Sequence, residues 1–243
     1  TAVGLRKDSQ LVSQTARVAS IDPVAFPLSR TMRFRDTNLE TLSLVNPPRD
    51  FDGVLLNSDS IRVHGFKEVL KEFPENEVAE LIKYHNKNGG LSRYVKFRYF
   101  FENIRLEKIT DSEIQRYADI YSKIMLGLLC DVNRLIPETM AYVRSYYNEL
   151  RMHIVSGSDQ IELRQLCVKL GIDSYFKSIH GSPTPKGALV RNIITEYGYD
   201  AATCVLIGDS INDYEAAVNN NLRFICYNNS EINHLGDPDL RLF

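Results

Sequence analysis

Acidic and hydroxyl residues gather in three short motifs along the chain. Asp50-Phe51-Asp52-Gly53-Val54 comes first, Ser156-Gly157-Ser158 follows an apolar run, and Gly208-Asp209-Ser210-Ile211-Asn212-Asp213 follows another. If the apolar runs are parallel strands of one sheet, ligands bind beyond their carboxyl ends, where these motifs would meet. We therefore expect three or four carboxylates, a hydroxyl and several glycine-flanked amides to share one site.

Carboxylates in such a cluster repel one another unless a cation neutralises them. A few oxygen ligands suit Mg²⁺, which keeps several waters and often bridges to a phosphate of its substrate. Lys186 adds a second argument, since Thr184 and Pro185 predict that a helix begins there. A cation in the first turn opposes the helix dipole by about 0.3–1 kcal/mol. A nearby carboxylate and an anionic ligand would offset that cost.

Each motif also has a purely structural interpretation. Asp50-Phe51-Asp52 could be a solvated turn, and Ser156 could belong to ordinary turn chemistry. Asp213 could be a first-turn acid in a helix that Ser210 caps, and Lys186 could be a surface residue. The order of the motifs and their positions after predicted strands favour a functional site over these separate explanations.

The elements that would position these motifs are of two kinds. Between residues 59 and 134 the apolar spacing predicts about four helices and no strand, at 63–73, 75–85, 92–104 and 111–129. Beyond residue 137, expected helices at 137–150, 159–170, 185–197 and 213–219 alternate with expected strands at 152–155, 204–207 and 223–227. Asp159 and Glu162 have the spacing of a capping box. The alternation predicts a parallel α/β sheet with helices on both faces.

Composition sets outer limits on the function. The chain has 243 residues, 44% hydrophobic and 25% charged, which is typical of a soluble globular protein with one domain or one domain and an insertion. A net charge of −2 gives no support for nucleic-acid or membrane partners. No signal peptide and no apolar run of about 20 residues is found, so we expect a cytoplasmic protein. The four widely spaced cysteines are expected to be free thiols.

Taken in order, the first motif, Ser156, Lys186 and the Gly208–Asp213 motif resemble the four motifs of the haloacid dehalogenase (HAD) superfamily. The resemblance covers about residues 50–227 and implies a Rossmann-like α/β core. The helical insertion is similar to the cap of the phosphoglycolate-phosphatase and β-phosphoglucomutase branch. The implied domains are a core at 41–58 and 135–243, a cap at 59–134, and an N-terminal segment of unclear role at 1–40.

The resemblance implies catalytic and metal-binding roles for the acids. Asp50 would be the nucleophile that forms an aspartyl-phosphate, and Asp52 would be the general acid and base. Mg²⁺ would bind the carboxylates of Asp50 and Asp209 and the backbone carbonyl of Asp52, with Asp213 in support. Asp52 favours phosphoester chemistry, because the family's dehalogenases lack an acid at that position.

The phosphoryl group and the leaving group would meet different residues. The phosphoryl oxygens would be held by Ser156, the Gly157 amide and Lys186, which would also offset charge in the transition state. Lys186 is therefore also predicted to be a catalytic residue. Arg93 and Lys96 share one face of the helix predicted over 92–104 and could meet an acidic or sugar-like leaving group. An ordinary solvated face is the alternative.

Three further residues of the predicted cap are candidates for contact with the substrate: His85, Asn88 and Ser92. The same helix would place Phe100 and Asn103 beside the basic pair. Its neighbouring face should form the core of the cap, through Tyr94, Phe97, Phe101 and Ile104.

The implied function is a Mg²⁺-dependent phosphomonoester hydrolase that acts through an aspartyl-phosphate on a small phosphorylated metabolite, such as a sugar phosphate or a small acid. A sugar phosphomutase with the same core is one alternative. A catalytically impaired binding or regulatory module is another. It is suggested by Pro47-Pro48 before the first motif, because proline removes a donor from a central strand. The strand there is expected either to be short and to begin near Asp50, or to lie at 42–45.

Overall fold

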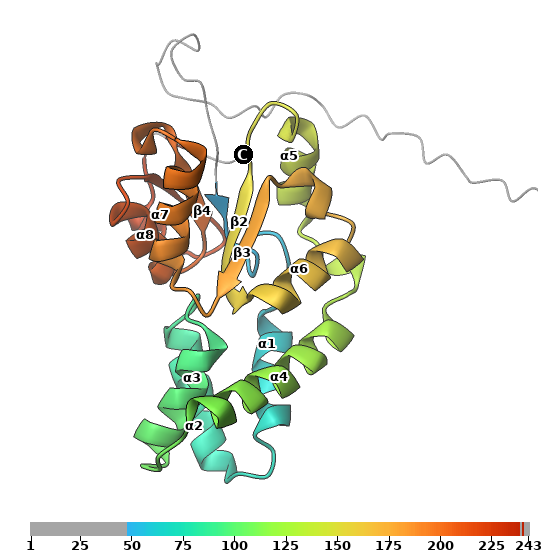
Figure 1. The fold of residues 1–243 in the computed structure, drawn as a ribbon, viewed down its shortest axis with the longest axis vertical. Helices are drawn as coiled ribbons and strands as arrows, with labels where there is room; N and C mark the ends of the chain where they lie inside the picture. The colour runs from blue at the N-terminus through green and yellow to red at the C-terminus, as the bar shows by residue number, and fades with distance from the viewer. Residues whose placement is uncertain (1–47, 239, 241–243) are drawn as a thin grey trace, which may run out of the picture. The chain divides into compact units, whose positions relative to one another are not determined.

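The computed structural model describes residues 48–238 and residue 240, and this part contains a parallel sheet flanked by helices (Figure 1). Within the described residues the sheet has five strands in the order β3-β2-β1-β4-β5, all paired in parallel. The strands are β1 (Pro48–Arg49), β2 (His153–Asp159), β3 (Ser178–Ser182), β4 (Val205–Gly208) and β5 (Arg223–Cys226). The predicted parallel α/β fold is confirmed.

The first strand is two residues long and lies between β2 and β4, although it contains a proline. It pairs with His153 and Ile154 of β2 and with Ile207 of β4. Just past it, the Asp50 backbone N–H donates to the Ile207 carbonyl at 3.0 Å and continues the pairing. In a strand this short the proline removes only one backbone donor from the sheet, so the chain can still form a strand directly before Asp50. The alternative strand at 42–45 lies outside the described residues, as does the segment 1–40.

Residues 59–134, called the helical insertion below, contain no strand, as predicted. The helices of the insertion are α1 (Asp59–Val69), α2 (Glu75–Lys87), α3 (Arg93–Tyr99) and α4 (Asp111–Leu128). A π-helical turn over Phe100–Ile104 continues α3, so the helix predicted over 92–104 changes its hydrogen-bond pattern towards its end. The start of α4 is fixed by a complete capping box between Thr110 and Glu113.

The remaining helices alternate with strands. They are α5 (Pro137–Tyr146), α6 (Gln160–Lys169), α7 (Lys186–Tyr197) and α8 (Ile211–Val218). All but α5, which ends four residues before its predicted limit, lie within two residues of the predicted bounds. The strand β3 is not among the predicted ones, because Ile179 is its only aliphatic residue. In addition, β2 continues to Asp159, four residues past its predicted end, through polar residues that an apolar pattern cannot detect.

The caps at the starts of α6 and α7 differ from the sequence-based expectation. Pro185, not Thr184, occupies the N-cap position of α7, and it makes no side-chain cap. Asp159 does cap α6, since its carboxylate accepts from the N–H groups of Ile161 and Glu162, each at 3.0 Å. The side chain of Glu162 does not complete the capping box, because it forms buried ion pairs instead.

One apolar cluster joins the helical insertion to the sheet. It includes Phe51 and Leu55 from the loop after β1, Phe66 from α1 and Ile154 from β2, all of them buried. The ring of Phe66 lies 4.6 Å from that of Tyr121 on α4. This packing fixes the insertion over the carboxyl ends of the strands, where the sequence motifs lie.

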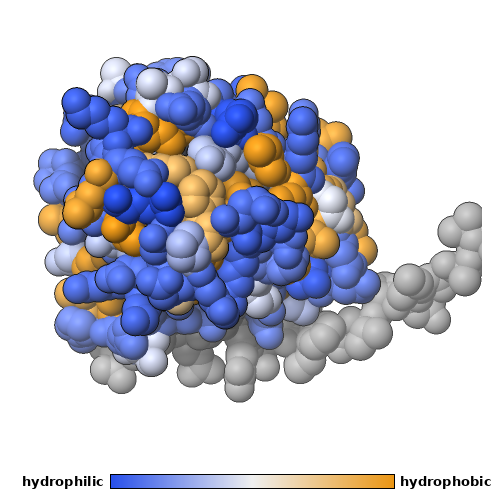
Figure 2. Space-filling model, turned by 90° about the horizontal axis from the view of Figure 1, so that it is seen from below, coloured by the Kyte–Doolittle hydropathy of each residue, from blue (hydrophilic) through white to orange (hydrophobic). Residues whose placement is uncertain are grey.

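Outside this cluster the insertion is mostly polar. Figure 2, seen from below, shows hydrophilic residues over most of that face, with hydrophobic residues between them. None of the described helices is both long and apolar enough to cross a membrane. The four cysteines are free, as predicted, and two of them, Cys167 and Cys204, are buried.

Candidate active site

A cavity of about 460 Å³ lies between the carboxyl ends of the strands and the helical insertion. Its floor comes from the three sequence motifs and includes Asp50, Asp52, Ser156 and Asp209. Its opposite wall comes from the insertion. The wall includes four basic or ring-nitrogen side chains: Arg62, His85, Arg93 and Lys96. The structure therefore brings together residues from six helices and strands or the loops that follow them: β1, β2, β4, α1, α2 and α3.

Three acids of the floor converge. Asp50 follows β1, Asp209 follows β4 and Asp213 lies in the first turn of α8. One carboxylate oxygen from each lies within 4.8 Å of the others. Close packing permits this approach: Gly53 has φ 72°, and a Cβ there would lie 1.7 Å from Asp209 Oδ2. Any side chain at this glycine would displace the acid.

Burial of these acids changes their ionisation. Burial, followed by the charge of Asp213, raises the pKa of Asp50 to about 7. Burial, followed by the charge of Asp50, raises the pKa of Asp209 to about 9. The nearby Lys186 lowers both values but does not outweigh the other acids. The floor thus holds more negative charge than its own lysine can balance, which favours a bound cation.

Lys186 reaches two of the acids from the start of α7. Its buried Nζ lies 3.0 Å from Asp50 Oδ2 and also pairs with Asp213 Oδ1. Burial opposes its charge, but Asp213 and Asp50 hold the pKa of Lys186 above its ordinary value. The alternative prediction that Lys186 is a surface residue is therefore wrong, because its ammonium is buried between two carboxylates.

Asp213 combines the two roles that its sequence position allowed. Its Oδ2 accepts from the Ser210 N–H at 3.1 Å and from the Ser210 hydroxyl at 2.5 Å, which forms a capping box at the start of α8. Its Oδ1 accepts from Lys186. The cap holds one carboxylate oxygen and thereby orients the other towards the lysine.

Asp52 is separated from the acid cluster by its own partners. Its Oδ1 accepts from the Ser58 hydroxyl at 2.5 Å and from Arg62 Nε at 2.9 Å, and its Oδ2 accepts from the Ser158 hydroxyl at 2.7 Å. Burial would raise the pKa of Asp52, but Arg62 and the two serines outweigh it and lower the value to about 2. Its side chain is thus an ionised carboxylate bound to the helical insertion.

The second motif closes the floor against a glycine loop of the insertion. Ser156 is buried, and its hydroxyl accepts from the Ser158 N–H at 3.1 Å. A Cβ on Gly157 would lie 2.1 Å from the Gly90 carbonyl oxygen, so only glycine allows β2 to approach the loop around Gly90 this closely. Asn212 Nδ2 donates to the same carbonyl at 3.0 Å. The loop around Gly90 is therefore held by two of the motifs of the core.

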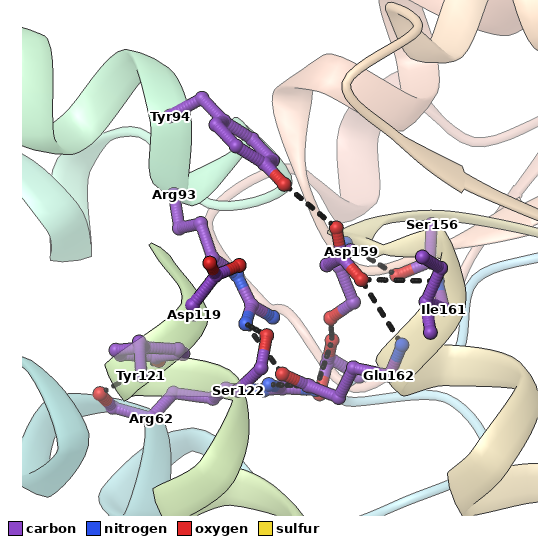
Figure 3. A network of polar contacts seen from close by, with 12 residues as sticks. Arg62, Arg93, Tyr94, Asp119, Tyr121, Ser122, Ser156, Asp159, Ile161 and Glu162 are labelled. Atoms are coloured by element: carbon purple, nitrogen blue, oxygen red, sulfur yellow. Dashed lines mark hydrogen bonds and ion pairs between the residues drawn. The ribbon is translucent and has the colours of Figure 1, made fainter. Parts of the chain in front are cut away.

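The basic wall contains an ion-pair network that the sequence did not predict (Figure 3). Glu162, whose side chain is fully buried on α6, lies 2.6 Å from Arg62 Nη1 and also pairs with Arg93 Nη1. Arg93 donates to the Ser122 hydroxyl at 2.7 Å, and its guanidinium carbon lies 4.5 Å from the centre of the Tyr121 ring. One acid of the core thus binds two arginines of the insertion.

The predicted basic face of α3 is buried, so the alternative of a solvated face is wrong. Arg93 is 4% exposed and Lys96 is 3% exposed. Lys96 Nζ lies 2.8 Å from His85 Nδ1. The expected neighbour Phe100 is fully buried in the apolar core, whereas Asn103 is exposed. Only the first two of these four residues therefore face the cavity.

Arg62, Glu162, Ser58 and Ser158 are the residues of this site that the sequence analysis missed. One signal was available for Arg62, which lies four residues before the buried Phe66 and so on the same face of α1. A charged residue on an apolar face indicates a buried partner. No comparable signal identifies Glu162, because its position in a first turn is also that of an ordinary capping acid.

Solved structures resemble this fold. A predicted phosphatase from Clostridium acetobutylicum aligns with a TM-score of 0.63 and 17% identity, over 79% of this chain and 90% of that chain. A predicted phosphoglycolate phosphatase from Haemophilus somnus aligns with a TM-score of 0.58 and 17% identity, over 77% of this chain and 85% of that chain. A protein assigned as the HAD-hydrolase YfnB from Bacillus subtilis, bound to magnesium, aligns with a TM-score of 0.55 and 13% identity, over 74% of this chain and 86% of that chain. At these identities the likeness shows the fold. A search among curated proteins found no match.

Residues 49–227 match the family model of the haloacid dehalogenase-like hydrolases. This match spans most of the chain and contains the three motifs, Lys186 and the helical insertion. The chain therefore belongs to the haloacid dehalogenase-like hydrolase family, which confirms the family predicted from the motifs. The solved neighbours include a predicted phosphoglycolate phosphatase, a member of the predicted branch.

Proposed function

We propose that the protein is a Mg²⁺-dependent phosphomonoester hydrolase that acts on a small phosphorylated metabolite through an aspartyl-phosphate on Asp50. The observation that carries this proposal is the convergence of Asp50, Asp209 and Asp213 within 4.8 Å beside the buried ammonium of Lys186. A cavity of about 460 Å³ suits a small ester. The names of two solved neighbours, both predicted phosphatases, agree with it.

The donor set fits a hard divalent cation. Three buried carboxylates offer oxygen ligands, and the repulsion that raises the pKa values of Asp50 and Asp209 would be relieved by a cation. Asp50, Asp209 and the Asp52 backbone carbonyl would hold the ion, with Asp213 in support. When bound, Mg²⁺ would neutralise this charge and that of the phosphoryl oxygens. The magnesium-bound solved relative agrees with this choice of metal.

The residues of the floor then have separate tasks. A carboxylate oxygen of Asp50 attacks phosphorus, the bond from phosphorus to the ester oxygen breaks, and the leaving oxygen receives a proton. Ser156, the Gly157 N–H and Lys186 bind the phosphoryl oxygens. A water molecule then attacks phosphorus, which releases phosphate and restores the Asp50 carboxylate.

Asp52 would give the proton to the leaving group and then take one from the attacking water. Both of its carboxylate oxygens are occupied in this structure, by Ser58, Arg62 and Ser158. These contacts also lower the pKa of Asp52 to about 2, so Asp52 must lose at least one of them before it can take up a proton and carry it to a leaving-group oxygen. Because Arg62 belongs to the helical insertion, this step couples the proton transfer to the position of the insertion.

The direct experiment is phosphate release from a panel of small phosphate esters, with and without Mg²⁺. We expect Mg²⁺-dependent turnover by the wild type and none by Asp50→Asn. Asp173→Asn, an exposed acid of the core, is the matched control and should retain full activity. Equal turnover by Asp50→Asn would refute the proposal.

A sugar phosphomutase with the same core would convert a sugar phosphate into its isomer without free phosphate. Analysis of the sugar products in the same assay separates the two functions. For a binding module without turnover, Asp50 would lie far from Asp209. The two acids instead share one cluster, which supports an enzyme.

A further inference from the structure

Three buried cations line the cavity, Arg62, Arg93 and Lys96, and a fourth, Lys186, lies against the Asp50 carboxylate of its floor. Three of these four cations have carboxylate partners. Arg62 and Arg93 share Glu162, and Arg62 also pairs with Asp52, so two acids match these two arginines. Lys186 faces an excess of acids in the floor. These three cations are therefore already balanced by the protein.

Lys96 is the exception. Its side chain lies on the cavity wall and is 3% exposed, and its only polar partner among the described residues is His85 Nδ1 at 2.8 Å. No carboxylate of residues 48–238 forms an ion pair with it. A buried ammonium without an anion is costly, because desolvation is not repaid by an opposite charge.

His85 cannot supply the missing charge. Burial, followed by the charge of Lys96, lowers the pKa of His85 to about 3, so its imidazole is neutral at pH 7. Its ring packs 5.0 Å from the ring of Phe66, which fixes its position beside Lys96. A neutral imidazole can orient an ammonium or donate one hydrogen bond to a ligand, but it leaves the positive charge uncompensated.

We propose that Lys96 and His85 bind a second anionic group of the substrate, a carboxylate or a second phosphate on its leaving-group side. This inference rests on the proposed function, since it divides the cavity between a phosphoryl end at the floor and an acidic end at α3. It also narrows the substrate class from phosphate esters in general to esters of an acidic alcohol. The charge of Arg93 is balanced by Glu162, so Arg93 then has a structural role: it fixes α3 against the core through this ion pair.

The test is a series of ω-carboxyalkyl phosphates of increasing chain length, each paired with the alkyl phosphate of equal length. A parallel series of α,ω-alkanediol bisphosphates distinguishes a second phosphate from a carboxylate. For each pair the readout is the ratio of kcat/KM between the doubly anionic and the singly anionic ester. The variants are Lys96→Met, which removes the charge, Lys96→Arg, which keeps it, and Lys67→Met, an exposed lysine of α1.

We expect the wild type to prefer one chain length of one acidic series by at least about tenfold, which corresponds to about 1.4 kcal/mol. Lys96→Met should lose this preference, Lys96→Arg should retain part of it, and Lys67→Met should retain all of it. The proposal is overturned if neither acidic series is preferred at any length, or if Lys96→Met keeps the preference of the wild type.

Binding separates this proposal from the proposed function. Carboxyalkyl and alkyl phosphonates, which resist hydrolysis, can be titrated calorimetrically into the wild type and Lys96→Met. Tighter binding of the carboxyalkyl phosphonate that depends on Lys96 supports the second-anion site even if no ester is turned over. Turnover of esters without such a difference in binding would support the hydrolase and refute the site.

Discussion

The floor and the wall of the cavity carry buried charges of opposite sign that the protein does not fully balance. In the floor, three acids converge on a single lysine, and two of them have pKa values well above the ordinary range. In the wall, two arginines are matched by two acids, and Lys96 has none. A bound metal ion would neutralise an excess of buried acids, whereas a bound anion would neutralise an excess of buried basic groups. The two halves of one cavity are therefore suited to opposite ends of one ligand.

The two regions also differ in what their ion pairs connect. The contacts of Lys186 join strands and helices within the sheet region. Glu162 instead joins that region to α1 and α3 of the insertion (Figure 3). The first set shapes a site for chemistry, and the second fixes the insertion above it. Variants in each region should therefore fail in different ways.

The largest expected effect is on stability. Glu162→Gln leaves two buried arginines with one carboxylate between them, which should lower the free energy of unfolding by about 3–5 kcal/mol. Urea unfolding measures this loss, and exposed Glu149→Gln is the control. The double variant Glu162→Gln/Arg93→Met should lose less than the sum of the single variants. Additive losses would show that the network does not act as a unit.

In the floor, the effect should be on activity instead. Asp209→Asn removes a proposed metal ligand and should reduce kcat/KM by a factor on the order of 10²–10³. It relieves repulsion among buried acids, so the protein should not be destabilised in the absence of metal. Mg²⁺ should raise the Tm of the wild type more than that of this variant. An equal rise in both would remove Asp209 from the metal site.

The wall should respond to pH through Lys96. Burial, assisted by Arg62, Arg93 and Lys186 and opposed by Asp52, lowers the pKa of Lys96 to about 7. Lys96 is charged below this pH and neutral above it, so binding of a second anion should weaken as pH rises through about 7.

The measurement is the pH profile of the kcat/KM ratio between the acidic and the neutral ester. The ratio should fall by up to about tenfold per pH unit above 7 in the wild type. It should stay level in Lys96→Arg, since arginine keeps its charge. A flat wild-type profile would show that the charge of Lys96 is not used.

The smallest effect compares two similar helix starts. Thr110 with Glu113 begins α4 in the insertion, and Ser210 with Asp213 begins α8 in the floor, each with a complete capping box. Thr110→Ala and Ser210→Ala should each cost about 1 kcal/mol of stability. Only Ser210→Ala should also lower kcat, because its cap orients Asp213 towards Lys186. Equal activity in the two variants would show that the cap of α8 is structural alone.

The sequence predicted the floor better than the wall for a physical reason. Asp50 and Asp209 each follow a strand, and Ser156 lies within β2. Parallel strands bring their carboxyl ends to one edge of the sheet, so residue type and order were sufficient. The pairing of Arg62 with Glu162 joins residues 100 positions apart through the packing of helices, which no local pattern encodes.

Local patterns also failed where one residue type suits two roles. Glu162 has the position of a capping acid, yet burial against two arginines determines its contacts. The strand β3 escaped prediction because it is mostly polar. The prolines before Asp50 left two predictions open, a short strand near Asp50 or a strand at 42–45, and β1 is a strand of two residues next to Asp50.

The most direct test of the central claim is chemical identification of the phosphorylated residue. The enzyme is mixed with a hydrolysable ester and Mg²⁺, quenched in acid and reduced with borohydride, which converts an aspartyl-phosphate to homoserine. Peptide mass spectrometry should then find homoserine at position 50 only, in a reaction that requires Mg²⁺. Turnover of the ester without reduction at position 50, or with reduction at another aspartate, would contradict the account.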